Sequence, residues 1–482
     1  MVHHPAPGRR AWRVLAASGA AAALLAGAFT AGPAQAAQKL PALVKNPATY
    51  VDPIIGTSNA GNTYPGAVVP FGMLAWSPQT STGNQVSTPA PGGYRYDATK
   101  IRGFSLTHLN GVGCSGANGD IPIMPYVGDV TSSPTSDTKD ETYASTFSHA
   151  NEKAEAGYYS VRLDSGTSAS LTTTQRTGTG LFGFPAGKSA SMLFRTSNSE
   201  SGSTDATVKV DPKTQTVSGS VDAGNFCGPQ SANNRTDGYT LYFTAHFDTE
   251  FASEGTWKDD TLTPGSTSTS GGTGYSSSGN PVAGKGSGAY VTFPAGTRQV
   301  QVKVAVSYVS KANAELNLKV ENPKNQTFDK TRHQATKAWN TALKSVQIGG
   351  GTQDQRTTFY TALYHSMLEP TLTSDVDGRY LGGDRKVHRV TKYQDEQYGT
   401  FSGWDQYRGQ VQLLALLDPD VASDYAQSLK NYADQRGGEW DRWLLENAKT
   451  SVMSGDPSAA ALAGMYAFGA RGFDVKGRSR RS

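Results

Sequence analysis

The chain has 482 residues, with 44 lysines and arginines against 40 aspartates and glutamates, so its net charge is only +4. This balance, without a basic run in the body of the chain, argues against a nucleic-acid-binding protein. Two cysteines, Cys114 and Cys227, could form one bridge but not a disulfide framework, and their pairing is left open. The 54 glycines and 22 tyrosines suit an all-β domain with aromatic-lined clefts.

The first 36 residues have the pattern of a signal peptide. A positive region that includes Arg9 and Arg13 precedes the apolar run LAASGAAAALLAGAFTA, and the sequence AQA that ends at Ala36 has the small-x-small form of a cleavage site. The apolar run is too short and too rich in alanine for a membrane anchor, which is the competing interpretation. The sequence therefore predicts a secreted protein whose mature chain starts near Ala37 and has no membrane attachment.

From residue 37 to 310, short β-type runs alternate with turn residues. ATVKVDPKTQTVSGSVDA has a period of two around a predicted hairpin turn at Asp211-Pro212-Lys213, and YTLYFTAHFDT and VQVKVAVSYVS are further predicted strands. The Ser/Gly-rich segment Thr263–Gly288 is predicted to be a long flexible loop. Strands at this spacing, with no helices between them, predict a β-sandwich over residues 37–310.

The period changes after a predicted linker at residues 311–328. One helical face of the next segment carries Ala335, Ala338, Trp339, Ala342, Leu343 and Val346. FYTALYHSML is predicted to form a second helix that ends before Glu369-Pro370. Two more helices are predicted at 406–417 and 421–433, on either side of a DPD turn. A β-sandwich followed by helices over 329–482 is an α+β arrangement in two domains.

The segment NAGNTYPGAVVPFGM, residues 59–73, cannot form a regular helix. Gly61, Gly66 and Gly72 permit positive φ or a close backbone approach, while Pro65 and Pro70 fix φ and remove N–H donors. We expect a rigid, shaped loop, and such loops often carry binding sites. The alternative is a plain network of turns in a large β-domain.

Two polar clusters have simple structural interpretations. In GFSLTHLNGVGC, His108 taken alone is more simply a hydrogen-bonded, partly buried histidine than a ligand. Asp375, Asp377 and Asp384 in SDVDGRYLGGDRKVH resemble a calcium loop, but their spacing is not that of an EF-hand and the glutamate that this pattern requires is missing. A turn-rich connection explains these aspartates equally well.

A third cluster has the composition of a sugar-binding site. Trp404 and Asp405 in TFSGWDQYRG lie at a predicted loop-to-helix junction, where Asp405 either caps the helix or faces a ligand. Arg442 and Asp456 lie near two further tryptophans in GGEWDRWLLENAKTSVMSGDPSAA. An aromatic ring beside a carboxylate offers an apolar face and acceptors for hydroxyl groups. Helix–helix packing is the alternative role of these later tryptophans.

Together these motifs resemble glycoside hydrolase family 92, the exo-acting α-mannosidases. The matching segments are VDPIIGTSNAGNTYPGAVVPFGMLAWSP, GFSLTHLNGVGC, GNFCG, FYTALYHSMLEPTLTSDVDGRYLG, TFSGWDQYRG and SGDPSA. They keep the family's order and cover nearly the whole mature chain. The resemblance implies a β-sandwich followed by the first part of an (α/α)6 barrel. It also implies a calcium-dependent, inverting α-1,2-mannosidase that releases terminal mannose from mannose-containing glycans.

The resemblance further implies a set of site residues. The loop at 59–73 would reach over the mouth of the barrel and help to shape the mannose pocket. Family members use a glutamic acid, an aspartate base and a bound calcium, and inversion requires the two carboxyl groups to stand roughly 6.5 to 9.5 Å apart. Calcium suits the binding of sugar hydroxyls because it is a hard cation that takes oxygen ligands. The expected substrate-binding residues are Asn62, Tyr64, His108, Cys227, Trp404, Asp405, Arg442 and Asp456.

The chain departs from the family pattern in its helical part. No match to the family's acid, base or calcium-binding segments is found before Ser482, so no catalytic residue or calcium ligand is assigned. Glu446 is expected to be a surface group or a group behind the site. The helical part is too short for six helical hairpins, and the basic ending KGRSRRS breaks the helical pattern. We therefore expect a truncated chain that is inactive on its own.

Two rival interpretations belong to other classes. One is a non-catalytic secreted carbohydrate-binding protein that uses the sandwich and a half-barrel as a lectin-like surface. The other is a sandwich-plus-barrel enzyme for a different sugar, such as a glucoamylase-like hydrolase or a glycoside phosphorylase. The linked motifs PGAVVPFGM, THLNGVGC and SDVDGRY favour the mannosidase pattern over the second rival. Linkage preference and oligomeric state do not follow from the sequence.

Overall fold

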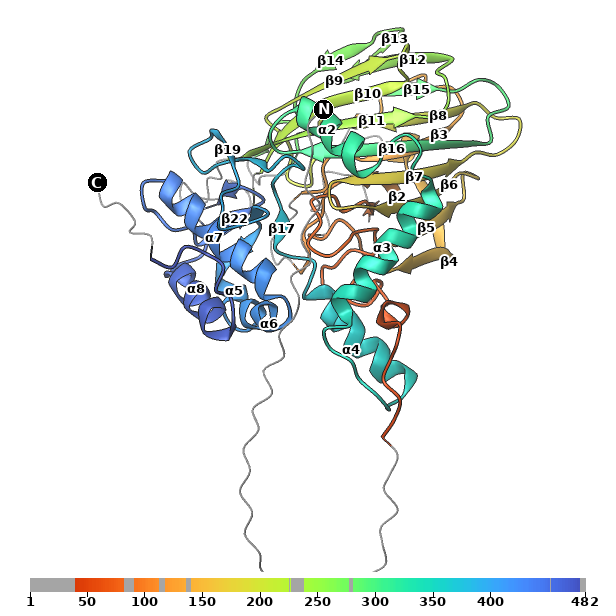
Figure 1. Cartoon of the computed structure of the whole chain (residues 1–482). Coiled ribbons are helices and arrows are strands. Elements are labelled where there is room, and N and C mark those ends of the chain that lie inside the picture. The colour runs from red at the N-terminus through yellow and green to blue at the C-terminus, as the bar shows by residue number, and fades with distance from the viewer. Residues whose placement is uncertain are drawn as a thin grey trace, which may run out of the picture. The chain divides into compact units, whose positions relative to one another are not determined.

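The computed structural model describes residues 40–81, 91–111, 118–135, 140–224, 226, 238–276, 281–450 and 452–476 (Figure 1). The expected signal peptide and both cysteines lie outside these residues. Residues Met1–Ala42 and Leu43–Ser482 form separate units, and the second contains the β-rich part and the helical part together. No helix in the described ranges is long and apolar enough to cross a bilayer.

Among the described residues, sixteen strands join in one continuous antiparallel sheet. They are β1 (Ser77–Ser81), β2 (Lys100–Ser105), β3 (Ile123–Val127), β4 (Ser145–Glu155), β5 (Tyr158–Leu163), β6 (Ser168–Thr173), β7 (Thr177–Gly183), β8 (Ala190–Phe194), β9 (Asp205–Asp211), β10 (Thr216–Ala223), β11 (Tyr239–Phe247), β12 (Ser253–Lys258), β13 (Thr261–Pro264), β14 (Ser268–Ser270), β15 (Ser287–Thr292) and β16 (Gln299–Ser307). Hydrogen bonding runs from β13 through β12, β15, β8, β3 and β2 to β4, and then through β5, β6, β7, β16, β11, β10 and β9 to β14.

The two halves of this sheet face each other, which makes the predicted β-sandwich. Phe194 of β8 stacks on Phe243 of β11 with ring centroids 6.1 Å apart, and both side chains are fully buried. β9 also contacts β15, and β12 contacts β14. The predicted hairpin between β9 and β10 is confirmed, because the Asp211 carboxylate accepts a hydrogen bond from the backbone N–H of Lys213 at 3.0 Å.

The segment Thr263–Gly288 is not one long loop, so that prediction is wrong. It contains the end of β13, all of β14 and the start of β15. β14 pairs with β9 in a register that sets Thr269 opposite Val208. The serines and threonines of this segment form an edge strand because their extended backbone completes the hydrogen bonds of β9, which composition alone does not reveal.

The helical part begins directly after β16. Its helices are α2 (Lys311–Glu321), α3 (Phe328–Leu343), α4 (Gln353–His365), α5 (Gly403–Gln406), α6 (Gln410–Leu417), α7 (Pro419–Gln435) and α8 (Pro457–Phe468). Short strands lie between them: β17 (Thr371–Leu372), β18 (Arg379–Leu381), β19 (Val387–Arg389), β20 (Tyr398–Gly399), β21 (Phe401–Ser402), β22 (Trp443–Leu445) and β23 (Ala448–Lys449). The 3-10 helix η1 (Pro47–Tyr50) and the short helix α1 (Asp140–Tyr143) belong to earlier segments. The interval 311–328, expected to be a linker, contains α2, which packs on β16 and β11 (Figure 1).

The predicted apolar face of α3 is buried. Ala335, Trp339 and Leu343 are inaccessible to solvent, and the indole N–H of Trp339 donates to the carbonyl oxygen of Val68 at 2.7 Å. Because Val68 belongs to the loop at 59–73, this bond joins the loop to the helical part. The predicted turn before α7 is also present, with Asp418 accepting a hydrogen bond from the N–H of Val421 at 3.1 Å as the helix cap.

The loop at 59–73 is shaped as expected, but its glycines do not supply the positive φ angles. Those belong to Asn59, Ala60, Asn62 and Phe71. Gly66 is required for a different reason, since a Cβ atom there would lie 2.2 Å from the Cβ of Ser77. The loop is held against the helical part on both sides of Phe71, whose N–H donates to Met367 and whose carbonyl accepts from Leu372, each at 3.0 Å.

Candidate functional site

A cavity of about 550 Å³ lies where loops of the β-rich part meet the helical part. Leu109–Gly111 line it together with His365, Ser366 and Glu369 at and after the end of α4. The remaining lining residues come from the α5 region and from an aromatic cluster: Thr400, Ser402, Asp405, Gln406, Gln410, Phe226, Trp443 and Met453. Cavities between two folded parts are common places for binding sites.

Leu109–Gly111 belong to an irregular hairpin that follows β2. Its arms are residues 106–108 and 118–120. The N–H of Leu106 donates to the carbonyl of Asp120, and the N–H of Gly119 donates to the carbonyl of Thr107, each at 2.9 Å. A β-bridge pairs His108 with Asn118. We call residues 106–111 and 118–120 together the 106–120 hairpin, and the end of its first arm, Leu109–Gly111, which we call its tip, lines the cavity.

Glu369 lies beside Asn110 in the cavity lining, four residues after α4. Its carboxyl is 7% exposed and accepts a hydrogen bond from the backbone N–H of Asn110 at 2.9 Å. Burial raises the pKa of Glu369 to about 8, while the bonds from Asn110 act in the opposite direction. The cavity wall therefore carries a carboxyl group that is neutral at pH 7.

Two further polar atoms at this wall have no hydrogen-bond partner within the described residues. They are Nε2 of His365 and Oδ1 of Asn110. Burial lowers the pKa of His365 to about 4, so its ring is neutral and can donate or accept one hydrogen bond. Buried polar atoms normally have partners, and unpaired ones that line a cavity indicate a place for water or ligand.

Asp405 lines the same cavity from α5. It is exposed, and one carboxylate oxygen accepts a hydrogen bond from the Ser402 hydroxyl at 2.5 Å. Across the lining, Trp443 stacks on Phe226 with ring centroids 4.2 Å apart and planes at 22°. The cavity thus combines a carboxylate with an aromatic wall. Trp404, next to Asp405, is 47% exposed and does not line the cavity.

The predicted residues Asn62, Tyr64 and His108 do not line the cavity: His108 belongs to the first arm of the 106–120 hairpin, and Asn62 and Tyr64 contact that hairpin. The carbonyl of Asn62 accepts a hydrogen bond from the N–H of Gly111 at 3.0 Å, and the Tyr64 ring packs on the His108 ring at 5.1 Å. His108 is buried, with its two ring nitrogens 2.8 Å from the Ser105 hydroxyl and 3.0 Å from the Gly92 carbonyl. Burial lowers the pKa of His108 to about 4.

Arg442 and Asp456 do not line the cavity either. Arg442 immediately precedes Trp443 of the aromatic wall, and its carbonyl accepts a hydrogen bond from the N–H of Gly403 at 3.1 Å. Asp456 is exposed at the residue before α8. Cys227 lies outside the described residues, next to Phe226 of the cavity lining. Of the eight predicted binding residues, the structure places Asp405 in the cavity wall.

Glu446 is not a surface group, so that part of its prediction is wrong. It is 1% exposed and lies in the turn between β22 and β23. Its carboxyl accepts a hydrogen bond from the side-chain amide of Asn118 at 2.6 Å. Burial raises its pKa to about 7, while the bond from Asn118 opposes this rise and the nearby Asp120 adds to it. The sequence WLLENAK gives no sign that its carboxylate points into the β-rich part.

Asn110, His365 and Glu369 were not predicted as site residues, although all three lie in or beside the motifs that carried the resemblance. One signal was present: Glu369 is the single carboxylate in the run SMLEPTLTS, where apolar neighbours indicate burial. A buried carboxylate is a candidate for function. The pairing of Glu369 with Asn110 depends on the three-dimensional fold and had no local signal.

The described residues do not fit the calcium site that the resemblance implies. Nowhere among them do three His, Cys, Asp or Glu side chains converge so that they could hold a metal ion. Calcium takes six to eight oxygen ligands, with carboxylates prominent among them. In the cavity wall, the carboxyl groups are those of Asp405 and Glu369. No step of a reaction is therefore assigned to calcium here.

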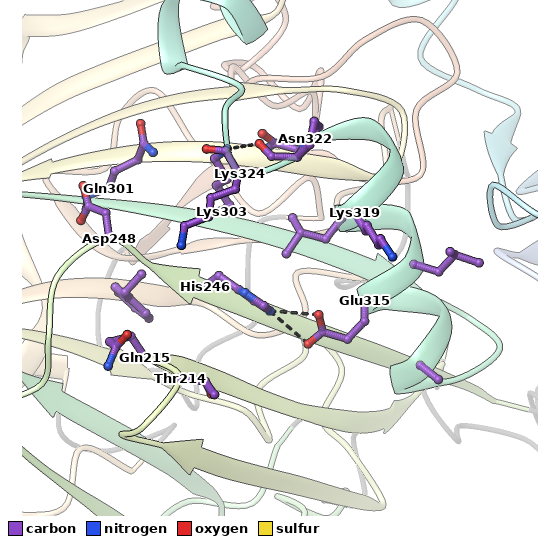
Figure 2. A pocket seen from close by; sticks show the side chains of 15 residues that line it. Thr214, Gln215, His246, Asp248, Gln301, Lys303, Glu315, Lys319, Asn322 and Lys324 are labelled. Carbon is purple, nitrogen blue, oxygen red and sulfur yellow. Dashed lines mark hydrogen bonds and ion pairs between the residues drawn. The ribbon is translucent and has the colours of Figure 1, made fainter.

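A second cavity, of about 850 Å³, lies between α2 and the adjoining strands and shares no lining residue with the first (Figure 2). Several of the charged groups that line it already have partners. His246 pairs with Glu315 at 3.0 Å, and the Lys303 ammonium donates to the carbonyl of Pro323 at 2.5 Å (Figure 2).

Comparison with known proteins agrees with the architecture. The model of the glycosyl hydrolase family 92 N-terminal domain matches residues 50–307, and that of the family's catalytic domain matches residues 313–479. An uncharacterized secreted glycosidase from Arthroderma benhamiae is 26% identical over 334 residues, which are 67% of this chain and 41% of that protein.

Solved structures give the same family. A family 92 α-mannosidase from Bacteroides thetaiotaomicron matches with a TM-score of 0.77 and 27% identity, over 89% of this chain and 55% of that one. An inverting mannosidase of the family from the same organism matches with a TM-score of 0.73 and 26% identity, over 89% and 54%. The chain therefore spans about half the length of these relatives. Its two family-model matches and its β-rich and helical parts show that the chain belongs to glycosyl hydrolase family 92.

Proposed function

We propose that this chain is a secreted member of the exo-α-mannosidase group whose cavity at Asp405 binds a terminal mannose, most simply an α-1,2-linked one. The observation that carries the proposal is the placement of the Asp405 carboxylate and the Trp443–Phe226 stack in the wall of one cavity. A solved family 92 relative with 27% identity has mannoimidazole bound, as its description states. The pattern of the first 36 residues and the likeness to a secreted glycosidase support export.

The chemistry of the cavity suits a monosaccharide. The Asp405 carboxylate can accept hydrogen bonds from two adjacent sugar hydroxyls, which are donors of matching geometry. The aromatic wall covers the apolar face of a pyranose ring. Nε2 of His365 and Oδ1 of Asn110 supply further hydrogen-bonding positions in the lining. Its volume of about 550 Å³ accommodates one sugar with space for part of a second.

The other predicted binding residues have supporting positions in this proposal. Asn62 and Tyr64 contact the 106–120 hairpin, and His108 belongs to its first arm. In this proposal they do not touch the sugar but fix the position of Leu109–Gly111. The residues proposed at the rim of the cavity are Trp404, Arg442 and Asp456, and Cys227, outside the described residues, stays a predicted binding residue without a position.

The chain by itself is proposed to bind mannose without turning over mannosides. Inverting hydrolysis needs an acid at the leaving oxygen and a base at the water, and the family resemblance assigns neither role to a residue of this chain. The loss of positioned proton transfer alone reduces rates by about 100- to 10,000-fold. Purified 37–482 chain, supplied with calcium and an aryl α-mannoside or an α-1,2-linked mannobiose, should release no mannose above background. Calcium-dependent release would contradict this part of the proposal.

The rival proposal is a carbohydrate-binding protein without catalysis. It would bind sugar in the same cavity, but no longer form of the chain would be an active enzyme. A longer chain that adds a Glu/Asp pair and releases mannose would favour the mannosidase. A longer chain that only binds would favour the lectin-like protein.

Binding itself is tested by calorimetric titration of the chain with methyl α-mannoside and methyl α-glucoside. Wild type should bind the mannoside, and D405A should bind it at least about tenfold more weakly, because a charge-assisted hydrogen bond contributes about 1.5 to 3 kcal/mol. H388A is the matched control, since His388 pairs with Asp384 at 2.8 Å and does not line the cavity. Equal mannoside affinity in wild type and D405A would remove Asp405 from the site.

A further inference from the structure

Two glutamates of the helical part form hydrogen bonds with the 106–120 hairpin at different positions along it. Glu369 accepts from the backbone N–H of Asn110 at the tip, at 2.9 Å. Glu446 accepts from the side-chain amide of Asn118 in the arm, at 2.6 Å. Neither bond is local in sequence, since 259 positions separate the first pair and 328 separate the second. The position of the tip in the cavity wall therefore depends on the helical part.

The backbone of Glu446 is fixed in an uncommon conformation. Its φ is +52°, in the left-handed region that non-glycine residues rarely occupy. The turn is held because the N–H of Thr400 donates to the Glu446 carbonyl at 2.9 Å, and because Leu445 pairs with Ala448 across β22 and β23. Strained backbone of this kind persists where the surroundings demand it. Here it directs a carboxyl group into the interior of the β-rich part.

The interior that surrounds the Glu446 carboxyl has acidic and phenolic groups, and none of the described cations forms an ion pair with it. The titratable groups that act on it are Asp120 from the hairpin arm, Tyr239 from β11, Tyr308 after β16, Tyr64 from the loop at 59–73 and Glu369 after α4. One Glu446 carboxylate oxygen, Oε2, has no partner within the described residues. A charge at this place is disfavoured, because burial without a counter-ion is costly and Asp120 adds repulsion.

We infer that Glu446 is a positioning residue, which in its uncharged form sets the 106–120 hairpin, through Asn118, so that Leu109–Gly111 form the cavity wall. Ionisation of Glu446 places an unpaired charge beside Asp120 at the base of the hairpin. The bond from Asn118 itself favours the charged form, but burial, which is the largest effect, and Asp120 oppose it. Entry of water or withdrawal of the turn between β22 and β23 would relieve the charge and loosen the hold on the hairpin. The tip then keeps its bonds to Glu369 and Asn62, but the hairpin arm loses its bond to the helical part through Asn118.

This arrangement makes the cavity sensitive to pH in one direction. Burial raises the pKa of Glu446 to about 7 and that of Glu369 to about 8. Burial therefore favours the neutral form of both groups over the charged form. The hairpin is therefore held most firmly in mildly acidic solution and loosens as the pH rises through 7 and 8. The relation to sugar binding rests on the proposed function, whereas the hold on the hairpin does not.

The direct test is amide hydrogen exchange of peptides that cover residues 104–111, measured without any sugar. Wild type, E446Q and E446A are compared at pH 6 and at pH 8.5, each variant against wild type at the same pH. E254Q is the control, because Glu254 is a partly exposed glutamate on β12 outside the hairpin. E446Q keeps an acceptor for Asn118 and carries no charge at either pH.

At pH 6, wild type and E446Q should exchange at equal rates. At pH 8.5, wild type should exchange about tenfold faster than E446Q, since the neutral acid is then a minor species. E446A should exchange fast at both pH values, and E254Q should match wild type throughout. Equal exchange of wild type and E446Q at pH 8.5 would overturn the inference, whether or not E446A folds.

Titration with methyl α-mannoside separates this inference from the proposed function. If the cavity binds the sugar, the affinity of wild type should fall about tenfold between pH 6 and pH 8.5, and that of E446Q should fall less. If no variant binds the sugar while the exchange pattern holds, the proposed function fails and the role of Glu446 stands. Sugar binding with identical pH profiles for wild type and E446Q counts against the role of Glu446.

Discussion

The Glu369 carboxyl accepts a hydrogen bond from the backbone N–H of Asn110 at 2.9 Å, across 259 positions of sequence. Both residues line the Asp405 cavity, one from each part of the chain. The cavity therefore exists only where the β-rich and helical parts are joined. Interactions that join them should affect ligand binding as well as stability.

Arg176 of the β-rich part forms several hydrogen bonds with residues of the helical part. It is 4% exposed, and its guanidinium donates to Glu321 at 2.7 Å, to Glu396 at 2.6 Å and to the carbonyl of Ser374 at 2.6 Å. R176A leaves buried or half-buried carboxylates without their cation, so the free energy of unfolding should fall by about 3 to 5 kcal/mol. Urea unfolding measures this loss.

The matched control is R379A, because Arg379 pairs with Asp377 while 44% of its side chain is exposed. Exposed ion pairs contribute about 0 to 1 kcal/mol. A loss in R176A no larger than in R379A would show that the Arg176 cluster does not join the two parts.

The stability of the protein should depend on the ionisation of Glu369. Its pKa is about 8 in the folded chain against an ordinary value of 4.5, so on raising the pH the unfolded chain releases this proton first. The free energy of unfolding should therefore be highest below pH 4.5 with respect to this group and should fall as the pH rises to about 8. E369Q should flatten that decline in urea unfolding at pH 5, 6.5 and 8. An unchanged slope in E369Q would mean that Glu369 ionises freely in the fold.

Trp339 and Trp404 should differ sharply in their effect on stability. Trp339 is fully buried, donates to Val68 at 2.7 Å and packs on Tyr364 with centroids 4.3 Å apart. W339A should lower the free energy of unfolding by about 3 to 5 kcal/mol. W404A removes a side chain that is 47% exposed and should change it by about 0.5 kcal/mol or less. Similar losses in both variants would place Trp404 in the core.

The helical part should be the more easily unfolded of the two. Leu413 and Leu416 of α6 and Tyr466 and Phe468 of α8 are exposed by 36%, 61%, 42% and 45%. Apolar patches of this kind favour association and local opening. Limited proteolysis should therefore cleave within residues 329–476 before it cleaves the β-sandwich. Equal protection of both parts would contradict this expectation.

The sequence predicted the elements better than it predicted the contacts between them. The period of two before residue 310 and the helical face of Ala335, Trp339 and Leu343 are local signals, and both were confirmed. The edge strand β14 was missed because its extended conformation depends on pairing with β9 and not on its own composition. Pattern alone could not show which predicted site residues meet.

Asp405 could be predicted because its place at the start of a short helix was visible in TFSGWDQYRG. The structure has it in the lining of the cavity. His365 and Glu369 were missed, since their role depends on the hairpin tip that packs against them from far away in sequence. Glu446 was assigned in part to the surface because a charged residue in a turn is usually exposed. Its left-handed backbone and its bond to Asn118 became visible only in the fold.

The most direct test is a crystal structure of the chain with mannoimidazole at saturating concentration. The inhibitor should lie in the cavity between the Asp405 carboxylate and the Trp443 ring, with a carboxylate oxygen of Asp405 within about 3 Å of a sugar hydroxyl. The same soak into D405A crystals should leave the cavity without ordered inhibitor. Inhibitor bound elsewhere on the chain, or bound identically in D405A, would contradict the assignment of this cavity as the mannose site.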